Sequence, residues 1–345
     1  MGDHLPRDLL TYIFSRLGVK QLCKLKCLPK EWLNTISSPH FKKQHLDQSK
    51  KRPTLSLISS PRSNYSFLSQ LFWARLVMFL PNWLSGKNID LQSLYQKDSS
   101  FAHAFWLCWS SLGYVSSTNE YKIVASYEGK VKYADGDFYT GFEESLCFNI
   151  LTLKLEEETS VVGSWRDLLL SCTQYSGTCH QPIHINGFIY WLAFAKYNTL
   201  SSDHVRILEM NLENEEIKTF CCPNGFSDFG FSHLSEINGH LCLVQNKRDG
   251  HMLNIWMLMA HESEAWCLEY SIEVHESASH YNIIGYLPRN NESTGDILIR
   301  SLKGDLFCYE TDTKSFKELQ SLNIVEYKWC ALFYDSFFSI GLPGN

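Results

Sequence analysis

The residues best suited to metal chemistry in this 345-residue chain gather in one short segment. They are Cys172, Cys179, His180 and His184. Thiolate and imidazole groups are the ligands that zinc prefers, but this spacing fits no zinc pattern and Pro182 separates the two histidines. No Cys-x-x-Cys pair occurs elsewhere in the sequence. We therefore interpret these residues as buried or loop positions and expect no metal and no other cofactor.

The sequence contains no motif for catalysis. It has no Gly-x-Ser-x-Gly nucleophile elbow, no glycine-rich phosphate loop and no His-Glu-x-x-His helix. Asp135-Gly136-Asp137 lacks the remainder of a calcium-binding loop, and Glu156-Glu157-Glu158 is typical of a solvated loop. These patterns predict no catalytic residue, so we expect a protein that binds other molecules and is not itself an enzyme.

Composition indicates an ordinary globular chain with room for a small and a large domain. Hydrophobic residues make up 44% and charged residues 20% of the sequence. The most apolar stretch, residues 71–84, is interrupted by Arg75 and Pro81, which argues against a membrane span. Twelve cysteines without a readable secretory signal are most simply reduced thiols, so we expect a cytoplasmic or nuclear protein.

Charge is distributed unevenly along the chain. Residues 1–52 hold 11 Lys and Arg against 4 Asp and Glu, a net charge of +7, and the remainder carries −13. The basic residues alternate with apolar residues and no aromatic platform accompanies them, so an acidic protein partner explains them as well as nucleic acid does. The acidic remainder argues against a polyanion as the main ligand. We expect neither nucleic acid nor a membrane as a partner.

The first 46 residues predict three short helices. Pro6 suits the first turn of a helix, and Gly18 follows the last apolar residue of the first one. The apolar face of this helix holds Leu9, Leu10, Ile13, Phe14 and Leu17. Leu22 and Leu25 belong to a second helix, and Trp32 belongs to a third that ends before Ser37-Ser38-Pro39. Three such helices bury little apolar surface by themselves, so their excess apolar face requires a partner.

The order and spacing of these residues resemble an F-box, the module that binds an SKP-family adaptor in cullin-type ubiquitin ligases. The resemblance lies in Leu5-Pro6, Arg16-Leu17, Lys30-Glu31-Trp32 and Ser37-Ser38-Pro39. It implies an adaptor-binding surface formed by Leu5, Pro6, Leu9, Leu10, Ile13, Phe14, Leu17, Leu22, Leu25 and Trp32. It also implies a cullin as an indirect partner. The alternative is a helical cap that packs only on the rest of the chain.

A β-rich domain follows the helices. Residues 47–63 read as a polar linker, a short strand at Thr54–Ile58 and a turn, so we place the domain boundary near residue 50 and assign residues 64–345 to the second domain. The phrase Ile185-Asn186-Gly187 before an apolar strand returns 52 residues later as Ile237-Asn238-Gly239. A repeat of about 50 residues built only from short strands predicts a β-propeller with about six blades. Neither the Gly-Gly kelch signature nor Trp-Asp occurs, so the blades are degenerate.

This domain resembles the kelch-like, F-box-associated domain of plant F-box proteins. The matching phrases are residues 113–124, Ser164-Trp165-Arg166, residues 185–192 and residues 207–215. The family's usual first-blade phrases are not found in residues 64–100. The expected fold is therefore multidomain, with a small all-α F-box followed by an all-β, propeller-like domain. The last strand pair is expected at residues 331–334 and 336–340, where it would close the ring.

Three functions are compatible with these patterns. The resemblance implies a substrate receptor of an SKP-cullin-F-box ubiquitin ligase, with an unknown target protein bound by the β domain. A second possibility is an F-box protein that binds the adaptor in a complex that does not ubiquitinate. A third is a propeller enzyme or carbohydrate-binding protein with a coincidental helical cap. The sequence identifies neither the target nor the residues that bind it.

Overall fold

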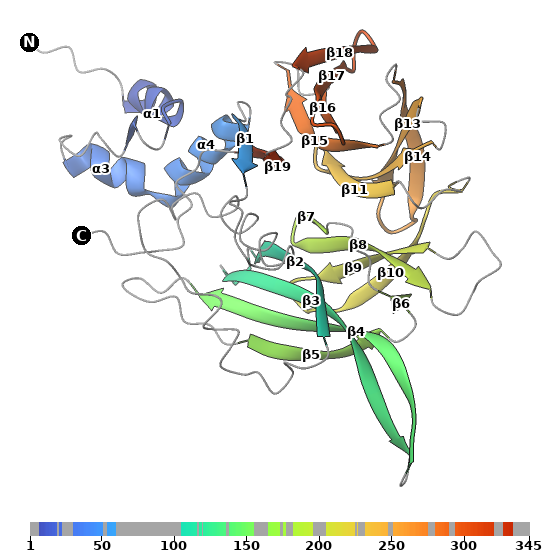
Figure 1. The fold of residues 1–345 in the computed structure, drawn as a ribbon. Coiled ribbons are helices and arrows are strands. Elements are labelled where there is room, and N and C mark those ends of the chain that lie inside the picture. The colour runs from blue at the N-terminus through green and yellow to red at the C-terminus, as the bar shows by residue number, and fades with distance from the viewer. Residues whose placement is uncertain are drawn as a thin grey trace, which may run out of the picture.

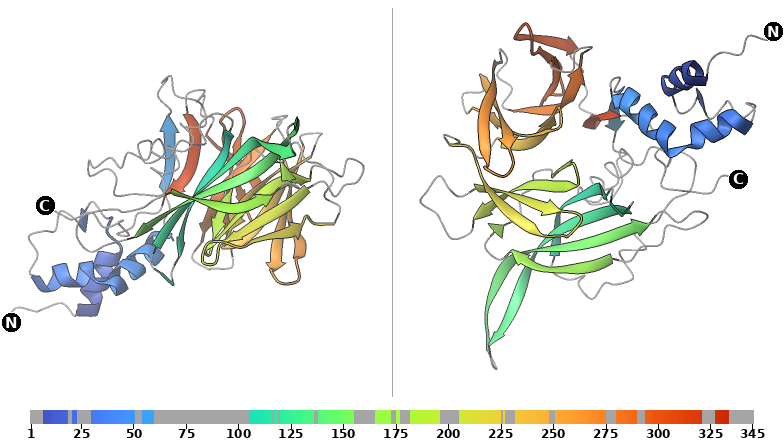
Figure 2. Two further views of the ribbon diagram at one scale, coloured as in Figure 1. Left: turned by 90° about the horizontal axis from the view of Figure 1, so that it is seen from below. Right: turned by 180° about the vertical axis from the view of Figure 1, so that it is seen from behind.

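The computed structural model has an α-helical N-terminal part followed by β-sheets arranged around a common centre (Figures 1 and 2). The residues that it describes are 7–18, 21–22, 30–50, 54–59, 105–115, 117–118, 120–135, 138–154, 165–172, 175–176, 182–195, 205–224, 226, 232–247, 251–274, 280–289, 294–320 and 327–333. This architecture confirms the expected fold class of a small helical module followed by an all-β, propeller-like domain. No described helix is long and apolar enough to cross a bilayer.

Three described helices form the N-terminal part: α1 (Arg7–Ser15), α3 (Lys30–Ser37) and α4 (Pro39–Lys50). The helix α4 extends through residues 47–50, where the sequence predicts the start of the linker. Its start is explained by Ser38, whose Oγ accepts a hydrogen bond from the Phe41 amide at 3.2 Å, as an N-cap does. Pro39 occupies the first turn, where its missing N–H has no cost. Ser37-Ser38-Pro39 therefore ends one helix and starts another.

Four sheets follow, which we name blades I to IV. Blades I, III and IV are four-stranded antiparallel meanders in chain order. Blade I contains β2 (Phe105–Val115), β3 (Glu120–Asp135), β4 (Phe138–Lys154) and β5 (Trp165–Cys172). Blade III contains β11 (Ser232–Ile237), β12 (His240–Asn246), β13 (Met252–Ala260) and β14 (Ala265–Glu273). Blade IV contains β15 (Tyr281–Pro288), β16 (Gly295–Ser301), β17 (Leu306–Glu310) and β18 (Ser315–Gln320).

Blade II has five strands because its first position is divided between two short segments. Its strands are β6 (Tyr175–Ser176), β7 (Ile183–Ile185), β8 (Phe188–Ala195), β9 (Val205–Asn211) and β10 (Ile217–Cys221). Both β6 and β7 pair with β8, the first with residues 194–195 and the second with residues 188–190. The first strands of neighbouring blades contact one another: β2 with β7, β7 with β11, and β11 with β15. These first strands therefore surround the centre, and the fourth strands lie outside.

A separate two-stranded sheet joins the beginning of the propeller to its end. The strand β1 (Thr54–Ser59) pairs antiparallel with β19 (Tyr327–Phe333), and β19 contacts β15 of blade IV. We had expected residues 331–334 to pair with residues 336–340. In the structure, residues 331–333 pair with residues 54–56, and the chain from residue 334 onward lies outside the described residues. The described part thus has four blades and this sheet, and residues 60–104 lie outside it.

The hydrophobic core lies between adjacent blades, because the middle strands bury both of their faces. On β8, Ile189 and Trp191 face blade I whereas Tyr190 and Leu192 face blade III. On β12, Leu243 faces blade II and Val244 faces blade IV. Side chains alternate between the two faces of a strand, so a strand that is covered on both sides reads as a continuous apolar run. The apolar runs of the sequence are explained in this way.

The two Asn-Gly phrases form the tight turns that the sequence predicts. Asn186 and Gly187 have φ angles of 49° and 86°, and Asn238 and Gly239 have 51° and 80°. Positive φ at both central positions matches the twist of the strands on either side, and Asn-Gly is the pair that adopts it most readily. The turns connect β7 to β8 and β11 to β12, the same step in two successive blades.

Candidate functional site

The helix α1 presents three large apolar side chains to solvent. Leu9, Tyr12 and Ile13 are 43%, 42% and 40% exposed. They are spaced at i, i+3 and i+4, so they share one face of the helix. The guanidinium of Arg16 lies 4.4 Å from the centre of the Tyr12 ring, which holds this ring in place. We call these three residues the α1 face. Scattered apolar residues are normal on a surface, whereas a contiguous set on one helix marks an interaction site.

The opposite side of α1 belongs to a small core within the helical part. Phe14, Leu22, Ile36 and Phe41 are buried, with Leu10, Leu17 and Trp32 packed partly buried against them. The rings of Phe14 and Trp32 meet edge to face with centroids 5.9 Å apart. A residue that fills this core supports the shape of the α1 face and is not free to contact a partner with most of its surface.

The ten residues expected to bind the adaptor therefore occupy different places. Leu9 and Ile13 lie on the exposed α1 face, whereas Leu10, Phe14, Leu17, Leu22 and Trp32 belong to the core. Leu5, Pro6 and Leu25 lie outside the described residues. Sequence reasoning missed Tyr12, although its position three residues after Leu9 and four before Arg16 was a readable signal. Among the basic residues of this part of the chain, Lys30 is described and exposed, and Lys20, Lys24 and Lys26 lie outside the described residues.

A buried histidine fastens α4 to the segment after α1. His45 is 2% exposed, and its Nε2 donates a hydrogen bond to the Leu17 carbonyl oxygen at 2.8 Å. Leu17 lies two residues after α1, so this hydrogen bond connects α4 to the turn that follows α1. Residues 51–53 alone separate α4 from β1. The helical part is thus connected by a very short segment to the sheet that joins the two ends of the propeller.

The joint between blades I and II contains a buried cation. The Lys122 ammonium donates to the Leu212 carbonyl oxygen and to Glu215, both at 2.6 Å, and Arg166 donates to the same carboxylate. Burial alone would raise the pKa of Glu215, but hydrogen bonds from Arg166 and Lys122 outweigh it and lower this pKa below its ordinary value. A cation as deeply buried as Lys122 requires such partners, so this network is structural.

The joint between blades II and III is made by the turn after β13. His261 reaches the Glu209 carboxylate on β9, which is 1% exposed, and its ring packs against Phe188 and Phe220. Burial, and then the neighbouring Glu209, raise the pKa of Tyr190. The carboxylate thus has partners from both blades, which explains how it tolerates burial.

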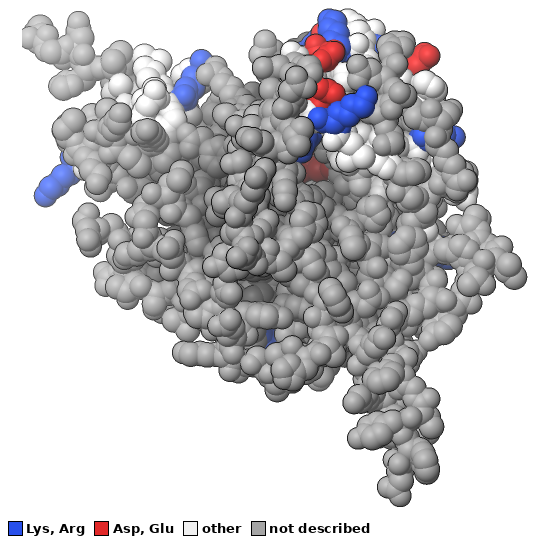
Figure 3. Space-filling view, viewed as in Figure 1, with Lys and Arg blue, Asp and Glu red and all other residues white. Residues whose placement is uncertain are grey.

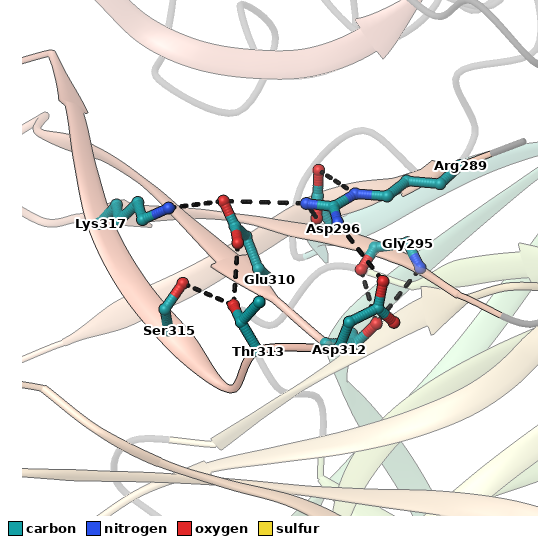
Figure 4. A network of polar contacts seen from close by, with 9 residues as sticks. Arg289, Gly295, Asp296, Glu310, Asp312, Thr313, Ser315 and Lys317 are labelled. Atoms are coloured by element: carbon teal, nitrogen blue, oxygen red, sulfur yellow. Dashed lines mark hydrogen bonds and ion pairs between the residues drawn. The ribbon is translucent and has the colours of Figure 1, made fainter.

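A third polar network lies at one end of blade IV (Figures 3 and 4). The Arg289 guanidinium pairs with Asp296 at 2.7 Å, Asp312 at 3.4 Å and Glu310 at 3.8 Å. Hydrogen bonds from Lys317 and then Thr313 lower the pKa of Glu310 to about 2. These carboxylates form ion pairs with cations of this chain. The network is therefore structural, and it links the β15–β16 connection to the β17–β18 connection.

The four residues whose types suit metal chemistry do not form a cluster where they are described. His184 lies on β7, and burial lowers its pKa to about 4. Cys179 and His180 lie outside the described residues, and Cys172 ends β5. Among the described residues no group of three His, Cys, Asp or Glu side chains is placed to hold a metal ion. The α1 face, with its three exposed apolar side chains, is the candidate site in the helical part of the chain.

Comparison with known proteins matches both parts of this architecture. The family model of the F-box associated beta propeller domain matches residues 102–336, and that of the F-box domain matches residues 3–44. F-box protein At3g57590 of Arabidopsis thaliana is 26% identical over 298 residues, which cover 76% of this chain and 70% of that protein. F-box protein At5g10340 of the same plant is 23% identical over 92% of this chain and 80% of its own length.

A further relative and one solved structure add less. Putative F-box protein At1g33530 of Arabidopsis thaliana is 26% identical over 76% of this chain, and the match spans 61% of that relative's length. A family 117 glycoside hydrolase of Zobellia galactanivorans superposes with a TM-score of 0.36 and 8% identity, over 79% of this chain and 76% of its own. A superposition at this level says nothing about activity.

Proposed function

Because this chain belongs to the F-box proteins that carry an F-box associated beta propeller domain, we propose that it is a substrate receptor of an SKP-cullin-F-box ubiquitin ligase. The F-box binds an SKP-family adaptor, the adaptor binds a cullin, and the propeller binds the target protein. The receptor catalyses no step itself. We place it in the cytoplasm or the nucleus, where such ligases act.

The observation that carries this proposal is the exposed α1 face. Leu9, Tyr12 and Ile13 remain in solvent although an internal core is available on the other side of the same helix. A module this small gains little by exposing large apolar groups, whereas binding an apolar groove of a partner removes them from water. The core behind them, centred on Phe14 and Trp32, fixes the helix that presents them.

The experiment is capture of the adaptor and a cullin by the full chain and by a Leu9→Ala/Ile13→Ala variant. Truncating a central apolar residue of an interface costs about 2 kcal/mol, so each substitution should weaken adaptor binding by about 30-fold. The matched control is Leu319→Ala, which truncates a leucine of the propeller that is 56% exposed. Only the α1 variant should lose the adaptor.

Two outcomes would change the conclusion. Adaptor binding that survives Leu9→Ala/Ile13→Ala as well as it survives Leu319→Ala contradicts the role of the α1 face. Adaptor capture by the wild-type chain without any cullin would instead support the alternative of an F-box protein that assembles no ligase. The two results are distinguished in a single capture because adaptor and cullin are detected separately.

A further inference from the structure

The outer edge of blade III differs from the outer edges of the other blades. Its strand β14 has nine residues and contains no Lys, Arg or Pro. The outer strands of blades I, II and IV carry Arg166, Lys218 and Lys317. Basic side chains, proline, short length and β-bulges are features by which natural proteins keep an open sheet edge from pairing with another chain. The strand β14 lacks the first three, and its bulge lies at Glu269.

The side chains of β14 around Leu268 are exposed on both faces of the strand. Cys267, Leu268 and Glu269 are consecutive and all exposed, Leu268 at 41%. Consecutive residues of a strand point to opposite faces, so this part of β14 projects beyond its neighbours. Met259, at the end of β13 before the connecting turn, is 56% exposed. An open backbone edge with apolar side chains beside it is the arrangement that binds an extended peptide as an additional strand.

Charge indicates which peptide would fit. Glu269 and Glu273 on β14 and Glu262 in the preceding turn are exposed, and no Lys or Arg of the described part of the chain pairs with them. This differs from blade IV, where Arg289 and Lys317 occupy the carboxylates. Acidic groups that pair with no cation of the described residues favour a basic partner. Two copies of β14 side by side would instead bring like charges together, which disfavours self-pairing.

A β-bulge limits the length of the available edge. Leu268 pairs with Trp256 and Tyr270 with Ile255, so Glu269 is the extra residue and the strand bends there. A second irregularity lies between Leu258 and Ala260 on β13, so the regular part of β14 consists of Trp266–Leu268, with Glu269 at its end. Trp266 in this part donates its indole N–H to the Cys221 carbonyl oxygen of blade II at 3.1 Å, which fixes the strand in place.

We propose that the outer edge of β14 binds an extended, lysine- or arginine-containing segment of a protein by strand addition, with apolar contacts to Leu268 and Met259. The inference rests on the proposed function, because this segment would belong to the target that the propeller presents to the ligase. Backbone hydrogen bonds supply affinity, and Glu262, Glu269 and Glu273 select basic sequences.

The test uses the exposed thiol of Cys267 as the probe of occupancy in the full chain. The ligand is a synthetic peptide of alternating lysine and valine, and a peptide of alternating glutamate and valine is its control. Alkylation of exposed Cys267 is followed by mass spectrometry, with the rate in the absence of peptide as the reference. The basic peptide should slow alkylation of Cys267 severalfold, and the acidic peptide should leave the rate unchanged.

The variant Glu269→Lys/Glu273→Lys should abolish the protection of Cys267, and Glu318→Lys on β18 of blade IV is the matched control that should retain it. Three results would each overturn the proposal. They are equal protection by both peptides, protection that survives the charge reversal, and protection that appears when the chain alone is concentrated. Adaptor binding is measured on the same samples. A wild-type chain that does not bind the adaptor would contradict the proposed function but not the binding site on β14. Failure of the proposed function and failure of this site are therefore distinguished.

Discussion

At the residue scale, Glu215 is the group on which the joint between blades I and II depends. It accepts hydrogen bonds from both Lys122 and Arg166, and Lys122 is buried. Glu215→Gln leaves a buried ammonium without its counter-charge, so we expect a loss of about 3 kcal/mol in the free energy of unfolding. Arg166→Gln, which removes the more exposed of the two cations, is the control and should cost less than 1 kcal/mol, about what a surface ion pair contributes.

The same carboxylate makes stability depend on pH. The pKa of Glu215 is lower in the folded chain than its ordinary value of 4.5. Its contribution is therefore complete above pH 4.5 and is lost as the pH falls through the folded-state value. Denaturant unfolding between pH 3 and pH 7 should show a decline on the acid side that is shallower in Glu215→Gln. Parallel curves for the two proteins would contradict this role.

Two glycines illustrate different reasons for lacking a side chain. A Cβ at Gly113 would lie 2.1 Å from Leu212 Cδ1 and 2.7 Å from His184 Cδ2, whereas a Cβ at Gly187 would meet no atom within 4 Å. Gly113→Ala should therefore cost about 1–3 kcal/mol through overpacking. Gly187→Ala should cost about 1 kcal/mol through its positive φ of 86°, and Gly187→Asn should restore most of this loss. Denaturant unfolding of the three variants tests the order.

At the element scale, the sheet of β1 and β19 joins the two ends of the propeller. Deletion of residues 327–345 removes β19 and exposes the paired edge of β1. An exposed edge promotes aggregation, so we expect this truncation to lose its cooperative thermal transition and to aggregate. Deletion of residues 334–345, which retains β19, is the control and should be less damaging. A soluble 327–345 deletion with a wild-type melting curve would refute closure by this sheet.

Sequence reasoning found some strands of the blades, among them β8 and β12, because their signals are local. The Asn-Gly turns at Asn186 and Asn238 and the Lys303-Gly304-Asp305 connection between β16 and β17 are encoded by adjacent residues. The partner of β19 could not be found in this way, since β1 lies more than 260 residues earlier and no local pattern relates the two. The helix α4 was missed because Ser38-Pro39 was interpreted only as a stop, although it is also an N-cap.

The candidate site was predictable in part for the same reason. The apolar periodicity of α1 is local, and it identified Leu9 and Ile13 together with Leu10 and Phe14. Which of these residues face solvent depends on where α3 and α4 pack, and this is decided by contacts with Trp32 and Phe41. The pairing of Lys122 with Glu215 joins residues 93 apart, and a single sequence contains no signal for it.

At the scale of the whole molecule, our proposal assigns binding of the adaptor and binding of the target to separate surfaces. The α1 face lies in the helical part, and the joints between blades are fastened by Lys122, His261 and Asn246 without using it. Asn246 alone makes two hydrogen bonds to the backbone of Tyr281 across blades III and IV, at 3.1 and 2.8 Å. Substitutions in α1 should therefore leave the propeller folded and able to bind its target.

The measurement that tests this division most directly is quantitative mass spectrometry of the proteins captured from plant cells by the wild-type chain and by Leu9→Ala/Ile13→Ala. We expect the variant to lose the SKP-family adaptor and the cullin together and to retain the target, at equal or greater abundance. A variant that still captures adaptor and cullin at the wild-type level, or that loses the target along with them, would contradict the account.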